Sequence, residues 1–306
     1  MTTSARFPDR IVCSYLFTIT KHGYPPPAEG MPQHLREMQA MGFTSVELEG
    51  IRREHLLEVY QKKDEIARTA RDLGLQVPIF CTVLPGLASW NRTERQENLS
   101  LLRKGCEVAR SLGSRTVLDN GPLPPYRFSG DIPVVRHYDA DVLLGAALPA
   151  DLNWKEYWKS LIDTYRAVCD TAADYGLTYT MHPSLGVLSA TTDGFLHLSD
   201  AIGRPNLRFV IDTANQFLVR DNLALSVCRL TGLVDYIHLS DNGGTKLEHL
   251  APGKGVIPWD SFFNQLAQTG FDGLIGIDVG GAESGVVELE KAYTDAAHWL
   301  MDKWPR

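Results

Sequence analysis

Residues 234–279, VDYIHLSDNGGTKLEHLAPGKGVIPWDSFFNQLAQTGFDGLIGIDV, contain the pattern that decides the fold of this chain. The stretch begins with a short apolar run at 234–241, which is typical of a strand buried on both faces. A glycine-rich loop follows, and residues 259–270 then have the apolar spacing of an amphipathic helix that ends at a glycine. A second apolar run, 273–279, predicts that the next strand lies parallel to the first.

The same strand–helix unit recurs along the whole chain. Eight strands are expected, each followed by a helix, over residues 11–19, 44–50, 76–83, 115–121, 177–183, 207–215, 234–241 and 273–279. Eight consecutive units in 306 residues predict an α/β fold of the (β/α)8 TIM-barrel type, with a single domain over residues 1–306. A doubly wound sheet is the alternative, but such sheets usually have fewer strands, and no glycine-rich fingerprint follows the first strand.

The composition is that of an ordinary globular protein with an acidic balance. The formal net charge is −7 and no basic block stands out, so we expect no nucleic-acid partner. No apolar run approaches the roughly 18 residues of a membrane-spanning helix, so no membrane partner is expected either. Five cysteines without a CxxC spacing, and an N-terminus without an apolar core, favour reduced thiols and a cytoplasmic location.

Two long connections depart from the bare barrel pattern. Residues 121–153 follow the fourth expected strand, and residues 241–258 follow the seventh. Both connections are therefore expected at the carboxyl ends of the strands, where TIM-barrel enzymes build their active sites. The proline-containing 121–153 segment is a candidate for a lid or for a subunit contact in a homo-oligomer.

Acidic and histidine side chains occur in three successive expected strands. These residues are Asp212, His238 and Asp278. Successive strands are neighbours in a barrel, so the three side chains can converge at its mouth. Each has an ordinary interpretation when taken alone, either as a carboxylate that caps a turn or as a core histidine bonded to the backbone. Their coincidence favours a metal or catalytic cluster, and mixed carboxylate and imidazole ligands suit Mn²⁺, Co²⁺, Fe²⁺ or Zn²⁺ better than Ca²⁺.

Two further strands carry polar side chains in alternation. Thr180 and His182 in the fifth strand face the same side, because side chains two residues apart share a face. Glu47 and Glu49 do the same in the second strand, and one of them is expected to face the pocket. A salt bridge to the arginines at 52–53 is the alternative for this pair of glutamates.

These residues resemble the xylose isomerase-like sugar phosphate isomerase/epimerase barrels. The resemblance includes HLSD at 238–241, a histidine-containing loop with Gly-x-Gly, a tryptophan, and FDG before a final acidic strand. LRFVIDTAN at 207–215 and FTSVELEG at 43–50 resemble the family's sixth and second strands. The family typically holds one divalent metal ion by a strand-five glutamate, a strand-six aspartate, a strand-seven histidine and a strand-eight glutamate. Asp212 and His238 match the second and third of these ligands.

Two positions depart from the ligand pattern that the resemblance implies. Asp278 stands where glutamate is usual, and Thr180 stands where the strand-five glutamate would be. Three arrangements remain open. In the first, the metal ligands are His182, Asp212, His238 and Asp278. In the second the metal is absent and the pocket binds its ligand by hydrogen bonds, and in the third three residues hold the metal while His182 acts as the base.

The resemblance implies an isomerase or epimerase that acts on a sugar, keto-sugar or cyclitol through an enediolate intermediate with one divalent metal ion. Mn²⁺ is the first expectation, with Co²⁺, Mg²⁺, Fe²⁺ or Zn²⁺ as alternatives. The expected catalytic residues are His182, Glu47 and Asp278, and the expected substrate-binding residues are Asp119, Asn215, His249 and Lys254. The alternative functions are a lyase or dehydratase of a keto-sugar, keto-glycoside or keto-inositol, and a metal-free barrel that binds a sugar without turnover.

Overall fold

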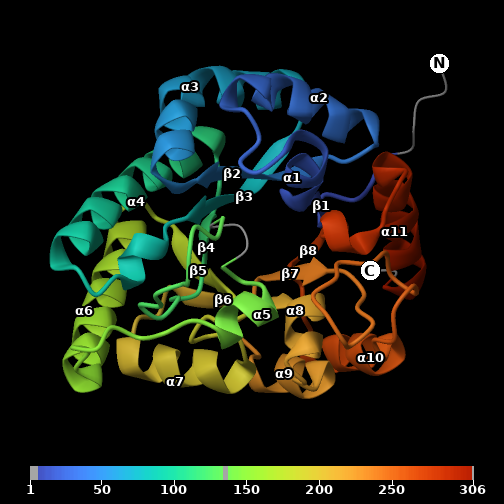
Figure 1. Cartoon of the computed structure of the whole chain (residues 1–306). Coiled ribbons are helices and arrows are strands. Elements are labelled where there is room, and N and C mark those ends of the chain that lie inside the picture. Colours follow the sequence, from blue (N-terminus) through green and yellow to red (C-terminus); the bar gives the residue numbers. More distant parts are fainter. Residues whose placement is uncertain (1–5, 134–136, 305–306) are drawn as a thin grey trace.

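A closed barrel of parallel strands forms the centre of the computed structural model, which describes residues 6–133 and 137–304 (Figure 1). The strands pair in the order in which they follow along the chain, and the last closes onto the first. Their bounds are β1 Ile11–Cys13, β2 Ser45–Ile51, β3 Gln76–Val83, β4 Thr116–Asn120, β5 Thr178–His182, β6 Leu207–Asp212, β7 Tyr236–Leu239 and β8 Leu274–Ile277. The predicted (β/α)8 TIM barrel is therefore confirmed.

Helices surround the barrel on its outside, as Figure 1 shows. Their bounds are α1 Leu16–His22, α2 Met31–Ala40, α3 Arg52–Asp72, α4 Arg92–Leu112, α5 Ala140–Leu144, α6 Trp154–Asp174, α7 Thr192–Ile202, α8 Thr213–Leu218, α9 Leu223–Arg229, α10 Trp259–Thr269 and α11 Leu289–Lys303. Among the described residues, no helix combines the length and the apolar character that a membrane crossing requires.

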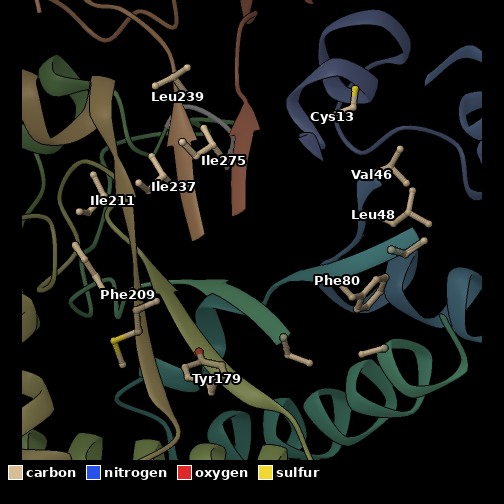
Figure 2. Close-up of a cluster of buried hydrophobic side chains, with 14 of the residues drawn as sticks. Cys13, Val46, Leu48, Phe80, Tyr179, Phe209, Ile211, Ile237, Leu239 and Ile275 are labelled. Carbon is tan, nitrogen blue, oxygen red and sulfur yellow. The ribbon is translucent and has the colours of Figure 1, made fainter. Parts of the chain in front are cut away.

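The main hydrophobic core lies between the strands and the helices. Figure 2 labels ten of its side chains: Cys13, Val46, Leu48, Phe80, Tyr179, Phe209, Ile211, Ile237, Leu239 and Ile275. The alternate side chains of the strands point into the barrel, where a smaller apolar cluster includes Val210 and Tyr236. Because side chains two residues apart share a face, Asp212 and His238 also point into the barrel.

The expected strand over 11–19 was wrong beyond its third residue. The strand ends at Cys13, and α1 begins at Leu16. Phe17 on this helix is fully buried, and its ring centroid lies 5.2 Å from that of Tyr293 on α11. A short apolar run fits either a strand or a buried helix, and here packing against the C-terminal helix favours the helix.

The loop after β7 is held in place by one buried carboxylate. Asp241 accepts hydrogen bonds from the backbone N–H of Gly253 at 2.7 Å and from the indole N–H of Trp259 at 3.0 Å. An isolated antiparallel bridge joins His249 of this loop to Gly280, which follows β8. The loop therefore carries His249 to the mouth of the barrel.

The long connection after β4 also reaches the carboxyl ends of the strands. It contains α5 and an antiparallel bridge between Arg127 and Ala147. Its residues Tyr138 and Asp139 line the cavity at this end of the barrel. Both long connections thus lie on the expected face, while a lid or subunit contact formed by residues 121–153 stays a prediction.

Candidate functional site

Four successive strands deliver polar side chains to the mouth of the barrel. His182 ends β5 and Asp212 ends β6, while His238 lies in β7 and Asp278 directly follows β8. Asp212 and His238 are partners in the strand register. All four side chains are buried. The structure thus brings together the four residues that the sequence predicts as metal ligands.

Short distances between nitrogen and oxygen atoms join these residues into one cluster. Nε2 of His182 lies 2.9 Å from Oδ2 of Asp212. Nδ1 of His238 lies 3.8 Å from Oδ2 of Asp278. One ligating atom from each of His182, Asp212 and His238 lies within 4.8 Å of the other two, which is close enough for one ion to bind all three.

His249 is a fifth member of the cluster, although the sequence predicts it only as a substrate-binding residue. Its Nε2 lies 3.9 Å from Oδ2 of Asp212 and 3.7 Å from Oδ2 of Asp278. These three residues form a second group whose ligating atoms lie within 4.8 Å of one another. The two groups share Asp212, so five side chains surround the same region.

The hydrogen bonds of His182 direct a lone pair towards Asp212. The Nδ1 atom lies 3.1 Å from the hydroxyl of Ser184, which itself donates to Oδ1 of Asn120 at 2.8 Å. The imidazole is therefore the donor to Ser184, and a neutral imidazole then has no proton left on Nε2. A lone pair facing a carboxylate at 2.9 Å is stable only with a cation between them, either a proton or a metal ion.

His238 is arranged in a similar way. Its Nε2 lies 3.1 Å from Glu47, and its buried Nδ1 has no hydrogen-bond partner among the described residues. Ser14 donates to Oδ1 of Asp278 at 2.7 Å, which leaves Oδ2 on the side of His238. Burial alone would lower the pKa of His238, but the charges of Asp278 and Glu47 outweigh burial and raise that pKa to about 9. The surroundings of this ring therefore favour a positive charge.

Asp212 is the anion at the centre of the cluster. Burial alone would raise its pKa, but the neighbouring imidazoles of His182 and His249 hold the pKa well below its usual range. Asn215 donates to this carboxylate from its backbone N–H at 2.9 Å and from its side-chain amide at 2.6 Å. Asn215, a predicted substrate-binding residue, thus lines the cavity and orients Asp212 at the same time.

The donor set fits one divalent transition-metal ion. Ligand atoms at about 2.0–2.2 Å from an ion lie roughly 3 to 3.5 Å from one another. The separations of 2.9 to 3.9 Å in this cluster approach that range. Three imidazoles and two carboxylates offer a mixed nitrogen and oxygen set, which suits Mn²⁺, Fe²⁺, Co²⁺ or Zn²⁺ better than Ca²⁺ or Mg²⁺.

The two glutamates of β2 are buried and do not belong to the cavity wall. Glu47 is fully buried and accepts the N–H of His238, so its contacts favour an orienting role over that of a base. Glu49 accepts a hydrogen bond from Thr18 at 3.1 Å, and burial raises its pKa to about 8. Within the described ranges, neither glutamate forms a salt bridge with the arginines at 52–53.

A cavity of about 650 Å³ opens onto the cluster. Its wall includes His182, His249 and Asp278, so three of the five clustered side chains are accessible to a ligand. The rest of the wall mixes two carboxylates, Asp139 and Glu283, with hydroxyl, amide and apolar side chains that include Tyr24, Asn120, Tyr138, Asn215, Leu185 and Val286. This mixture suits a small molecule with many hydroxyl groups.

Two of the predicted substrate-binding residues lie outside the cavity wall. Asp119 accepts hydrogen bonds from the backbone N–H of Leu84 at 3.1 Å and from the hydroxyl of Thr82 at 3.3 Å, and burial raises its pKa to about 8. The next residue, Asn120, lines the cavity instead. Alternation along β4 explains the difference, because adjacent side chains point to opposite faces. Lys254 is exposed on the loop after β7.

Residues 35–303 match the family model described as a xylose isomerase-like TIM barrel. The chain belongs to the xylose isomerase-like TIM-barrel family. An uncharacterised protein of Methanocaldococcus jannaschii is 28% identical over 135 residues, which are 41% of this chain. The match spans 46% of that relative, so less than half of its length is compared.

Solved structures share this xylose isomerase-like barrel at low sequence identity. A structure of L-ribulose 3-epimerase has a TM-score of 0.74 and 15% identity, and the match covers 97% of this chain and 95% of that chain. A structure of IOLI protein with a binding zinc atom has a TM-score of 0.69 and 17% identity, covering 96% and 97%. At these identities the likeness establishes a shared fold.

Thr180 distinguishes this xylose isomerase-like barrel from the ligand pattern that its sequence otherwise resembles. It is buried at the inward-facing position of β5, two residues before His182. A neutral hydroxyl is a poor ligand for a divalent ion. His182 and His249 each belong to a group of three possible ligands that includes Asp212.

Proposed function

We propose that this chain is a divalent-metal-dependent isomerase or epimerase that acts on a keto-sugar or cyclitol through an enediolate intermediate. The observation that carries the proposal is the cluster of five ligating side chains at the cavity of about 650 Å³. Nε2 of His182 directs a lone pair into the cluster, and the buried Nδ1 of His238 has no partner among the described residues. The relatives with the same fold include an epimerase of a keto-sugar and a protein with a binding zinc atom.

The residues that would hold the ion are His182, Asp212, His238, His249 and Asp278. A bound divalent ion acts as a Lewis acid that stabilises negative charge on the oxygens of an α-hydroxy carbonyl unit. Mn²⁺ is the proposed ion, because the mixed donor set suits a transition metal and because hydroxyl-rich ligands bring further oxygen donors. Glu47 orients His238, and Ser184 orients His182, through the hydrogen bonds at 3.1 Å.

Asp278 is the proposed base. It lines the cavity, and its Oδ2 is free of the hydrogen bond that Ser14 makes to Oδ1. The carboxylate would take a proton from the carbon next to the carbonyl group. Return of the proton to the neighbouring atom gives an isomer, whereas an epimer requires a second group that delivers a proton to the opposite face of the same carbon.

A lyase that acts on a keto-sugar, keto-glycoside or keto-inositol is the second candidate. The observation that favours it is Thr180, because exchange of the strand-five glutamate for threonine removes one of the two opposed bases of the family's epimerases. An elimination needs one base and one acid at the leaving hydroxyl group. For this reaction the other four clustered side chains would hold the ion, which leaves His182 in the cavity wall to serve as that acid.

Metal analysis of matched variants tests the proposed site. Protein purified without chelator should contain about one divalent ion per chain, and Asp212→Asn should contain almost none. Asp119→Asn is the matched control, because this buried aspartate lies outside the cavity and its pKa of about 8 makes it largely neutral near neutral pH. Full occupancy in Asp212→Asn, or equal losses in both variants, would contradict the proposed site.

The reaction class can be read from NMR spectra of keto-sugars incubated with the enzyme in D₂O. An isomerase or epimerase should incorporate deuterium next to the carbonyl group and yield a product of unchanged composition. A lyase should yield a product that has lost water or an alcohol. Metal-loaded protein that neither exchanges a carbon-bound proton nor releases a product with any ketose or cyclitol tested would favour the metal-binding barrel without turnover.

A further inference from the structure

Arg52 occupies a strained position where β2 passes into α3. Its backbone φ is +59°, in the left-handed region that residues other than glycine rarely adopt. Such conformations cost of order 1 kcal/mol and persist where surrounding structure enforces them, often at functional sites. Arg52 directly follows the last residue of β2, the strand that also contains Glu47. The junction between β2 and α3 therefore lies at the carboxyl end of the barrel (Figure 1).

The guanidinium of Arg52 has donors without acceptors. Its Nε and Nη2 atoms are buried, and neither has a hydrogen-bond partner among the described residues. Within the same ranges, no carboxylate forms an ion pair with this side chain. Residues 1–5, 134–136 and 305–306 contain no aspartate or glutamate. Arg52 as a whole is partly exposed, but its guanidinium is always charged, and two buried N–H donors without acceptors are costly.

The surroundings of the guanidinium place it beside the substrate cavity. Its Cζ lies 5.3 Å from the ring centroid of Tyr24, in a cation–π contact. Burial raises the pKa of Tyr24 and of Tyr138, and in both cases the positive charge of Arg52 opposes the rise. Tyr24 and Tyr138 both line the cavity of about 650 Å³, whereas Arg52 is not part of its wall, so the guanidinium lies behind the ring of Tyr24 and would reach a ligand by a side-chain movement.

We propose that Arg52 is an anion-recognition residue of this cavity, and that the substrate carries a carboxylate or phosphate group. The inference rests on the proposed function, which concerns the α-hydroxy carbonyl unit of the substrate. It adds that the substrate also carries an anionic group away from that unit. The planar guanidinium fork matches the two oxygens of a carboxylate or phosphate, so one group could satisfy both buried N–H donors. The substrate class is therefore an anionic keto-sugar or cyclitol derivative, either a sugar acid or a sugar phosphate.

Isothermal titration calorimetry with matched ligands tests this assignment. The probes are D-fructose, D-fructuronate and D-fructose 6-phosphate, each titrated into protein with and without Mn²⁺. The wild type should bind one of the anionic probes at least about ten-fold more tightly than D-fructose, as expected for one charge-assisted bidentate contact. The anion that binds more tightly identifies the group as carboxylate or phosphate.

Two neighbouring arginines provide the variant and its control. Arg52→Gln should lose the preference for the anionic probe, whereas Arg53→Gln should retain it, because Arg53 is exposed on α3. Arg52→Lys keeps the charge but not the fork and should retain part of the preference. If Arg52→Gln does not fold, the wild-type preference and the Arg52→Lys result decide the question.

The outcomes separate this inference from the proposed function. A wild type that binds no anionic probe more tightly than D-fructose overturns the role of Arg52, and so does a preference that survives Arg52→Gln. Normal metal content with either result leaves the metal site in place and refutes only the anion recognition. If Arg52→Gln loses the preference but the wild-type protein holds no metal, the metal-dependent function is refuted and the anion site is supported.

Discussion

Replacement of Glu47 by glutamine should weaken metal binding without changing a metal ligand. In the structure, one carboxylate oxygen of Glu47 lies 3.1 Å from both Nε2 of His238 and the hydroxyl of Tyr236. The other oxygen, Oε1, is buried and has no hydrogen-bond partner in the described part of the chain. If the amide oxygen of a glutamine replaces Oε2, the NH₂ group of that glutamine takes the position of Oε1. The variant therefore loses the charge that holds the His238 tautomer and buries an unsatisfied donor. Loss of such a contact typically costs 10- to 100-fold in metal affinity, or about 1.4 to 2.7 kcal/mol.

The metal dissociation constant, measured by competition with a chelator near neutral pH, is the appropriate readout. Glu49→Gln is the matched control, because Glu49 lies two residues further along β2 and makes no contact with His238. Its pKa of about 8 makes it largely protonated near neutral pH, so an amide changes little and affinity should stay within about three-fold. Unchanged affinity in Glu47→Gln, or equal losses in the two variants, would refute the orienting role of Glu47.

Three further predictions concern the stability of the barrel. Nδ1 of His55 accepts the backbone N–H of Ile51 at 3.0 Å, and burial lowers the pKa of His55 from 6.5 to about 4. As the pH falls, His55 is therefore protonated in the unfolded chain before it is protonated in the folded chain. The contribution of His55 to the free energy of unfolding is complete above about pH 6.5 and declines as the pH falls towards 4. Urea unfolding should show a loss of up to about 2.5 kcal/mol near pH 4.5, and His55→Gln should flatten this dependence. A Cβ at Gly276 would overlap the hydroxyl of Tyr236, so Gly276→Ala should lower the free energy of unfolding by about 1 to 3 kcal/mol in the same assay. Asp241→Asn weakens the acceptor of several N–H donors in the loop after β7, so limited proteolysis should cleave this loop faster than in the wild type.

The periodicity of the sequence was sufficient to predict the barrel, because each unit combines a short apolar strand with an amphipathic helix. The stretch over 11–19 shows where local pattern fails. Its apolar residues fit both a strand and a buried helix, and Phe17 adopts the helix because it packs against Tyr293 near the other end of the chain. That contact joins residues far apart in the sequence, so no local pattern could have predicted it.

The candidate site shows the same division between strands and loops. The positions of Asp212 and His238 follow from alternation along the strands, which fixes the face of each side chain. The approach of His249 to Asp212 depends on the path of the loop after β7, which spacing does not determine. The contrast between Asp119 and Asn120 was in principle predictable, since only one of two adjacent strand residues can face the cavity.

Thr180 and Arg52 have related consequences for the charge of the cavity. The ligand pattern that the family resemblance implies contains three carboxylates, so with a divalent ion it carries a net negative charge. Here Asp212 and Asp278 are the carboxylates among the five clustered side chains, and the other three are histidines that are neutral when they bind a metal. With a divalent ion this cluster is nominally neutral, so an anionic substrate meets less repulsion than it would beside a third carboxylate. The unpaired guanidinium of Arg52 adds a positive charge beside the cavity wall formed by Tyr24. In the proposed anion-binding cavity, the threonine would lower the electrostatic cost of admitting an anion and the arginine would attract it, so both residues favour the same class of substrate.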